Sequence, residues 1–226
     1  IITVVFTLVL ALSNIASSAK IIDWKVSLAG IPLAFDAGTV FFPIAYIFGD
    51  ILTEVYGFAR ARRVIWIGFI GLIFTFLMFL LIQKLPSEAT WQANVGQEAY
   101  DLVLGGISSG GIVAASVLGY LGGSFSNAII MALLKHITHG QQLWVRTISS
   151  TIVGELVDTA IFIAIASLTG VFPWGLYLTL TLTNYLFKVA IEVLMTPVTY
   201  WITNKLKKEE NLDAYSDLKD LTPLFF

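Results

Sequence analysis

Long apolar runs, separated by short charged stretches, dominate the chain. A helix that crosses the ~30 Å hydrocarbon core of a bilayer needs about 20 mainly apolar residues. Six windows meet this requirement and predict six transmembrane helices: Ile1–Ala19, Asp36–Tyr56, Val64–Ile82, Ile107–Leu134, Val145–Leu168 and Trp174–Ile202. The pattern therefore predicts an all-α integral membrane protein.

A shorter apolar segment, Val26–Phe35, precedes the second window and contains Pro32. It is too short to cross a bilayer as a helix, and proline is disfavoured inside helices because its nitrogen carries no hydrogen. We expect a re-entrant or surface segment here. The predicted organisation is a six-helix transmembrane domain, residues 1–206, followed by a cytoplasmic C-terminal tail, residues 207–226.

The composition agrees with a lipid environment. Of the 226 residues, 57% are hydrophobic and 12% are charged, whereas a soluble domain has about 25% charged residues. A net charge of −2 without a basic stripe argues against nucleic acid as a partner. The chain has no cysteine, which excludes disulfides, thiol nucleophiles and thiolate metal sites.

Lysine and arginine in the short loops predict the orientation, because such loops stay on the cytoplasmic side. Basic clusters follow the second, fourth and sixth windows and so share one side of a six-helix protein. We expect this side to be cytoplasmic, with both termini there, in the cell (inner) membrane. The clusters are Arg60, Arg62 and Arg63; Lys135 and Arg146; and Lys205, Lys207 and Lys208.

Small residues recur at four-residue spacing in the fourth window, as Gly106/Gly110 and Gly119/Gly123. This spacing lets two membrane helices approach closely. The close approach is either packing within one subunit or the face of a homodimer.

Ionisable residues inside apolar windows carry the functional signal, because each costs several kcal/mol in a bilayer and usually marks a partner or a function. Asp158 and Lys188 both fall near mid-depth, so we predict a shared polar cavity there. The set is Asp36, Asp50 and Glu54 in the second window, Glu155 and Asp158 in the fifth, and Asn184, Lys188 and Glu192 in the sixth.

Structural ion pairs are the alternative interpretation, and Lys188 with Glu192 would form one unaided. Six acids to one buried lysine leave a surplus, however, and surplus acids must be hydrated, protonated or available to a ligand. For Asp50 and Glu54 we favour a structural or gating role, with Arg60, Arg62 and Arg63 as pairing partners at the cytoplasmic end.

An enzyme or metal site is not indicated. His136 and His139 have no third ligand nearby, and the sequence contains no Ser/His or zinc-ligand constellation. Asp50 and Asp158 are candidates for the dyad of an intramembrane aspartyl protease, but the stretch before Asp50 lacks the first glycine of the Gly-x-Gly-Asp pattern. We expect neither a cofactor nor catalysis.

Several short motifs resemble the YhhQ-type queuosine precursor transporters, also called the vitamin uptake transporter family, over residues 1–206. These motifs are Asp36-Ala-Gly-Thr, Phe42-Pro43, Gly49-Asp50 with Glu54, Tyr56-Gly57, Arg62-Arg63, Ser150-Thr151, Gly154-Glu155 with Asp158-Thr159 and Phe162, and Asn184 with Lys188. The resemblance implies a six-helix carrier for deazaguanine bases or queuine. It also implies a bundle similar to the substrate-binding S components of energy-coupling-factor importers, working without their ATPase.

The residues fit such a ligand. A guanine-like base offers two adjacent donors that a carboxylate, Glu155 or Asp158, can accept, and a carbonyl for Lys188 or Asn184. Its flat face suits an aromatic ring, and the candidates are Phe42, Tyr46 and Phe162. The residues expected to gate or to couple an ion are Asp36, Asp50, Glu54, Arg62, Arg63 and Glu192.

Two other functions stay open. One is a substrate-binding subunit that needs an ATPase partner, although Ser13/Ser17 is the nearest match to the small-residue pair that such subunits dock through. The other is a proton-coupled carrier for another vitamin-like solute, which the surplus of acids favours.

Overall fold

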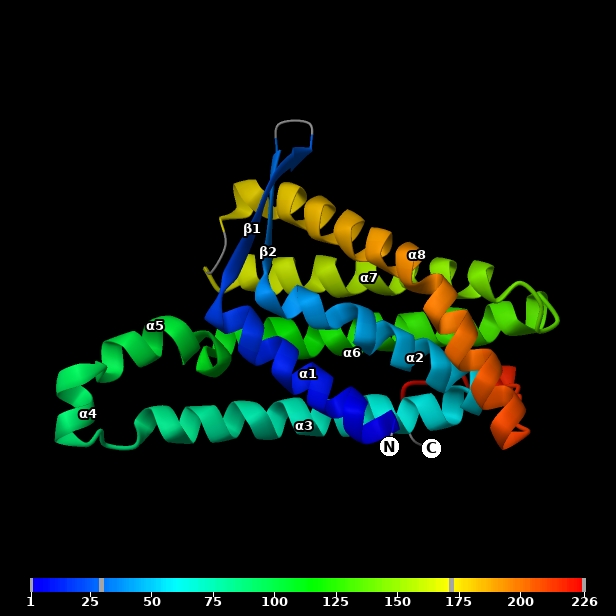
Figure 1. Cartoon of the computed structure of the whole chain (residues 1–226), viewed down its shortest axis with the longest axis horizontal. Coiled ribbons are helices and arrows are strands. Elements are labelled where there is room, and N and C mark those ends of the chain that lie inside the picture. The colour runs from blue at the N-terminus through cyan, green and yellow to red at the C-terminus, as the bar shows by residue number, and fades with distance from the viewer. Residues whose placement is uncertain (1, 29–30, 171–172, 225–226) are drawn as a thin grey trace.

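Helices that run back and forth along one axis make up most of the protein (Figure 1). The computed structural model describes residues 2–28, 31–170 and 173–224; for residues 18, 21, 23, 24, 26–28, 31–36, 39, 42, 43, 176, 179 and 180 it describes the backbone alone. The elements are α1 (Ile2–Ala19), β1 (Ile21–Leu28), β2 (Ile31–Asp36), η1 (Ala37–Phe41), α2 (Phe42–Tyr56), α3 (Phe58–Lys84), α4 (Ala89–Asn94), α5 (Gly96–Ser108), α6 (Gly110–Ile137), α7 (Leu143–Leu168), η2 (Trp174–Leu176), α8 (Tyr177–Glu210) and η3 (Leu218–Asp220).

Each of the six predicted windows coincides largely with one helix, in chain order α1, α2, α3, α6, α7 and α8, and the last four helices extend beyond their windows. Within the described residues, four stretches are long and apolar enough to cross a membrane: Phe58–Lys84, Gly96–Ile137, Leu143–Leu168 and Thr181–Glu210. The apolar part of α1 is shorter, and α2 has 15 residues. The prediction of a helical, multi-pass membrane protein is confirmed in this coarser form.

A β-hairpin stands where the sequence predicted a re-entrant or surface segment. Strands β1 and β2 pair antiparallel, with Ile22 opposite Phe35 and Leu28 opposite Ile31. Val26–Phe35 lies within this hairpin, apart from residues 29 and 30, which lie outside the described residues. The all-α fold class is corrected accordingly: runs of six to eight residues are long enough for strands that pair with each other, although they are too short to span as helices.

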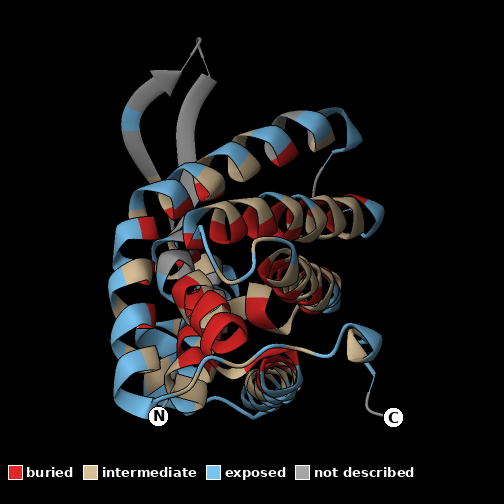
Figure 2. Ribbon diagram, turned by 90° about the vertical axis from the view of Figure 1, so that its right-hand side faces the viewer, coloured by how far each residue is buried: buried red, intermediate tan, exposed pale blue. Residues whose placement is uncertain are grey.

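Helix α2 lies in the middle of the bundle. One side of it, with Ala45 and Leu52, packs against apolar residues of α1, α3 and α6. The other side, with Ile47, Ile51 and Val55, packs against α8. Figure 2 shows buried residues gathered in the centre and exposed ones around the rim. Large apolar side chains such as those of Phe74 and Leu194 remain exposed on the outer helices, as a lipid-facing surface requires.

The junction between α2 and α3, the loop between α6 and α7, and the end of α8 meet at one end of the bundle (Figure 1). We call this the basic end, because it carries the three basic clusters. Gly57, with φ of +82°, makes the sharp turn between α2 and α3. Ile2 packs against the same cluster as Ile51 and Val55, so the start of α1 also lies towards the basic end.

Candidate functional site

A buried charged trio, Glu155, Asp158 and Lys188, joins α7 to α8. The Lys188 Nζ donates a hydrogen bond to Asp158 Oδ2 at 2.7 Å and forms an ion pair with Glu155 Oε2 at 3.0 Å. The side chain of Glu155 is 1% exposed, that of Lys188 9% and that of Asp158 18%. The structure therefore brings together the two acids and the lysine that the sequence placed at one depth, with Asp158 as the most accessible of the three.

Close approach of α6 to α7 positions the trio. Glu155 and Asp158 are three residues apart, so they share one face of α7. A Cβ at Gly123 would lie 2.6 Å from the Cβ of Asp158, and a Cβ at Gly119 would lie 2.8 Å from its Oδ1. These two glycines thus serve packing within the chain, one of the two roles predicted for them. A Cβ at Gly110, in contrast, would meet nothing within 4 Å among the described residues.

The other predicted binding residues whose side chains are described lie on three helices. Asn184 is one turn from Lys188 on α8, and Phe162 is one turn from Asp158 on α7; both are half-buried. Tyr46 is half-buried on α2. The side chains of Phe42 and Asp36 lie outside the described residues, so their predicted roles stay predictions.

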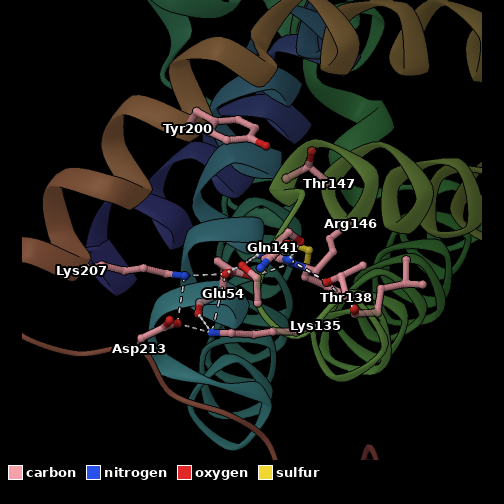
Figure 3. A network of polar contacts seen from close by, with 12 residues as sticks. Glu54, Lys135, Thr138, Gln141, Arg146, Thr147, Tyr200, Lys207 and Asp213 are labelled. Atoms are coloured by element: carbon pink, nitrogen blue, oxygen red, sulfur yellow. Dashed lines mark hydrogen bonds and ion pairs between the residues drawn. The ribbon is translucent and has the colours of Figure 1, made fainter.

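A second polar cluster surrounds Glu54 at the basic end (Figure 3). Arg146 donates to both Glu54 carboxylate oxygens, at 2.7 and 3.1 Å, and Lys207 donates to one of them at 2.6 Å. Lys135 donates to the Glu54 backbone carbonyl at 2.6 Å. Asp213 accepts hydrogen bonds from Lys135 and, at 2.9 Å, makes an ion pair with Lys207. This network joins α2, α6, α7 and α8.

The predicted partners of Glu54 were wrong. Arg62 pairs with Asp220 at 3.0 Å, whereas Arg60 and Arg63 are exposed. The turn at Gly57 starts a new helix, and on α3 the buried Arg62 side chain contacts the C-terminal segment instead of the centre of the bundle.

The C-terminal segment, residues 211–224, folds back over the basic end. The Ala214 amide donates to the Val55 carbonyl at 3.0 Å, and Trp66 Nε1 donates to the Pro223 carbonyl at 2.8 Å. Burial raises the pKa of Asp213, but hydrogen bonds from Lys135 and Lys207 outweigh this effect and hold the pKa below its ordinary value. The segment that the sequence predicted only as a cytoplasmic extension is therefore part of the network.

A third cluster lies between these two. Asp50 is 1% exposed and accepts a hydrogen bond from the Asn127 amide at 3.3 Å. Glu192, also 1% exposed, is close enough to Asp50 and Glu155 for their charges to interact. Neither carboxylate oxygen of Glu192 has a hydrogen-bond partner in the described part of the chain.

Residues 36–202 match the family model described as "Putative vitamin uptake transporter". This match covers well over half of the chain. The chain belongs to the vitamin uptake transporter family. It is therefore a membrane transporter and not an enzyme.

Two relatives are each described as "Probable queuosine precursor transporter". The protein from Bacillus subtilis is 29% identical over 175 residues, which cover 76% of this chain and 71% of that protein. The protein from Haemophilus influenzae is 26% identical over 167 residues, which cover 73% of this chain and 66% of that protein. No solved structure matches the chain.

The vitamin uptake transporter match includes the trio, the third cluster and the centre of the Glu54 network, but it ends before Lys207 and Asp213. In the sequence, Lys135, Arg146 and Lys207 were interpreted only as markers of orientation. The available signal was their position at the ends of apolar windows, where a long side chain can turn inward to a buried acid. Asn127, an amide inside the fourth window, was also missed.

Proposed function

We propose that this vitamin uptake transporter imports queuosine precursors, deazaguanine bases or queuine, across the cell (inner) membrane. The observation that carries the proposal is the buried trio between α7 and α8, in a chain with two relatives described as queuosine precursor transporters. A mostly apolar pocket with a few convergent polar groups is the usual form of a small-molecule site, and the trio supplies such groups.

Asp158 is the carboxylate best placed to meet a substrate, because it alone in the trio has appreciable exposure. Its oxygens would accept the ring N–H and the exocyclic amine of the base, and Lys188 or Asn184 would donate to the carbonyl. Phe162, one turn along α7, would stack on the ring, with Tyr46 and Phe42 as further candidates; such stacking contributes about 1–3 kcal/mol per base.

The geometry also allows Lys188 to change partner. When a base takes the Asp158 oxygen that Lys188 now occupies, Lys188 keeps its ion pair with Glu155. Binding then leaves no charge of the trio without a partner. Glu155, at 1% exposure, acts in this scheme as the anchor of the lysine and Asp158 as the contact to the base.

The finer topology is part of the proposal. Helices α1 and α2 would cross the membrane beside the four longer stretches, which makes six spans and places the basic end, with both termini, in the cytoplasm. Reporter fusions after Lys84 and Gly170 should then report the outside, and a fusion after Lys208 the inside. An outside signal after Lys208 would contradict this topology.

The Glu54 network would act as the cytoplasmic gate. It ties the end of α8 to α2, α6 and α7, so release of a substrate to the cytoplasm requires these contacts to break. Because the chain has no cysteine, a single Val55→Cys, buried under the C-terminal segment, would report opening through its reaction with a thiol reagent. Lys207→Gln should speed the reaction, and Lys205→Gln, which removes an exposed pair with Glu209 and a cation–π contact with the exposed Trp201, should not.

Uptake tests the function itself. Cells that lack their own transporter should accumulate a labelled deazaguanine base when they express this chain, and unlabelled deazaguanine should compete. A deazapurine without the exocyclic amine should compete poorly. Uptake at the background level, in cells where the protein is shown to be in the membrane, would refute the proposed substrate.

A further inference from the structure

Four buried oxygen atoms on the neighbouring helices α2, α6 and α8 have no hydrogen-bond donor among the described residues. They are Asp50 Oδ2, Asn127 Oδ1 and both carboxylate oxygens of Glu192. The residues that carry them are 1%, 8% and 1% exposed. The Asn127 amide nitrogen holds Asp50 at 3.3 Å, which leaves the carbonyl oxygen of the same side chain next to the carboxylate.

Unpaired carboxylates are unstable in such surroundings. Burying a charge without a partner is far more costly than burying a hydrogen-bonded polar group. Asp50 and Glu192 interact with each other and so add like-charge repulsion to this cost.

The cations on neighbouring elements already hold other acids. On α2, Glu54 is one turn from Asp50 and takes Arg146 and Lys207. On α6, Lys135 reaches the Glu54 carbonyl and Asp213. On α7 and α8, Glu155 and Asp158 take Lys188.

The charges of these clusters indicate how much positive charge is missing. The basic-end network has three cations, Lys135, Arg146 and Lys207, for the two acids Glu54 and Asp213, which leaves one positive charge in excess. Asp50 and Glu192 carry two negative charges beside it. One further positive charge would balance them. The trio carries one net negative charge, and this charge is not fully buried because the side chain of Asp158 is partly exposed.

We propose that Asp50, Asn127 and Glu192 bind one monovalent cation, a sodium ion or a proton. Carboxylate and amide oxygens are the donors that a hard cation prefers, and the same oxygens would share a proton between two acids. Asp50 is one turn from Glu54, and Glu192 is one turn from Lys188, so the site lies between the gate and the trio. Its role in coupling rests on the proposed transport function, but its occupancy does not.

The purified full chain tests the site through its unfolding temperature, measured without any deazaguanine. If sodium occupies the site, replacing choline by sodium at constant ionic strength should raise Tm in a saturable way, by roughly 5–10 °C at a hundredfold excess over Kd. If a proton occupies it, sodium should have no specific effect, and Tm should fall as the pH is raised and the proton leaves.

Neutral variants decide whether either response comes from these residues. Asp50→Asn and Glu192→Gln remove the charge that the cation neutralises while they keep the shape. Both should fold with a Tm at or above that of the unloaded parent and lose the sodium or pH response. Asn127→Ala keeps both acids and should raise the cation concentration needed for half of the effect by about tenfold, which corresponds to the loss of one ligand group. The exposed control Glu209→Gln should respond like the parent.

A response that survives in both Asp50→Asn and Glu192→Gln would overturn the proposal, as would a parent whose Tm ignores both sodium and pH. If the neutral variants do not fold, an unchanged response in Asn127→Ala would also overturn it. Because no substrate is present in the assay, a wrong assignment of the substrate would leave these outcomes unaffected.

Discussion

Glu54 on α2 and Arg146 on α7 hold each other through two hydrogen bonds of 2.7 and 3.1 Å, with the two side chains 0% and 1% exposed. Lys207 and Lys135 approach the same glutamate from α8 and α6. One carboxylate therefore holds four helices together at the basic end. The gate proposed above would therefore have a stable closed form, and its opening would require several contacts to break together.

Glu54→Gln should destabilise the protein strongly. The amide cannot neutralise Arg146, which stays buried. Removing one partner of a buried ion pair lowers the free energy of unfolding by about 3–5 kcal/mol. Unfolding of the purified protein by a denaturing detergent measures this loss. Glu209→Gln removes an exposed pair with Lys205 and should cost less than about 1 kcal/mol. Equal losses in the two variants would show that the Glu54 network does not stabilise the closed bundle.

Docking of the C-terminal segment should depend on pH through Asp213. Hydrogen bonds from Lys135 and Lys207 outweigh burial and hold its folded-state pKa below the ordinary value. A depressed pKa means that the contact stabilises docking above the ordinary range of an aspartate and is lost as the pH falls through the depressed value. Exchange protection of the Ala214 amide, which donates to the Val55 carbonyl, should therefore weaken on acidification after correction for the intrinsic rate.

Asp213→Asn should remove this pH dependence and show weak protection at neutral pH, whereas Asp217→Asn, at an exposed position, should behave like the parent. Protection of Ala214 that is the same in Asp213→Asn as in the parent at every pH would contradict the role of Asp213.

Gly123→Ala should disturb the trio without touching it chemically. The added Cβ would lie 2.6 Å from the Cβ of Asp158 and 2.9 Å from the backbone oxygen of Gly154, so α6 and α7 must separate. Overpacking of this kind costs about 1–3 kcal/mol.

Gly49→Ala is the matched control, because a Cβ there meets nothing within 4 Å among the described residues. The control should be neutral or stabilising by about 0.5–1 kcal/mol, as expected for replacing glycine inside a helix. The unfolding temperatures of both variants, compared with that of the parent, test this prediction. An unchanged unfolding temperature in Gly123→Ala would contradict the close approach of α6 and α7.

The length of the apolar runs was sufficient to locate the long helices, because only a helix that crosses a bilayer requires about 20 consecutive apolar residues. The same criterion missed the β-hairpin and the short helices α4 and α5, whose formation depends on local pairing and turns rather than on span length. Charges inside apolar runs pointed to Glu155, Asp158 and Lys188, because helical spacing places the first two on one face and depth matches the third.

Pairing between distant elements was harder to predict. Arg62 and Glu54 are close in sequence but separated by the turn at Gly57, and each found a partner elsewhere: Asp220 for Arg62, and Arg146 with Lys207 for Glu54. The position of a lysine or arginine at a helix end is compatible with two roles, a marker of a cytoplasmic loop and the partner of a buried acid. Only the packing of four helices at one end distinguishes these two roles.

Binding of a deazaguanine base to Asp158→Asn tests the central claim most directly. The asparagine keeps the volume but turns a donor towards the donors of the base, and each unsatisfied buried group costs about 1–3 kcal/mol. Affinity measured by titration of the purified protein should fall by about 10- to 100-fold by the same estimate, with little change in Tm, while the exposed control Asp101→Asn binds like the parent. A base without the exocyclic amine should bind the parent weakly and lose little more in the variant. If Asp158→Asn and Glu155→Gln both bind deazaguanine as tightly as the parent, the trio is a structural ion pair and not the substrate site.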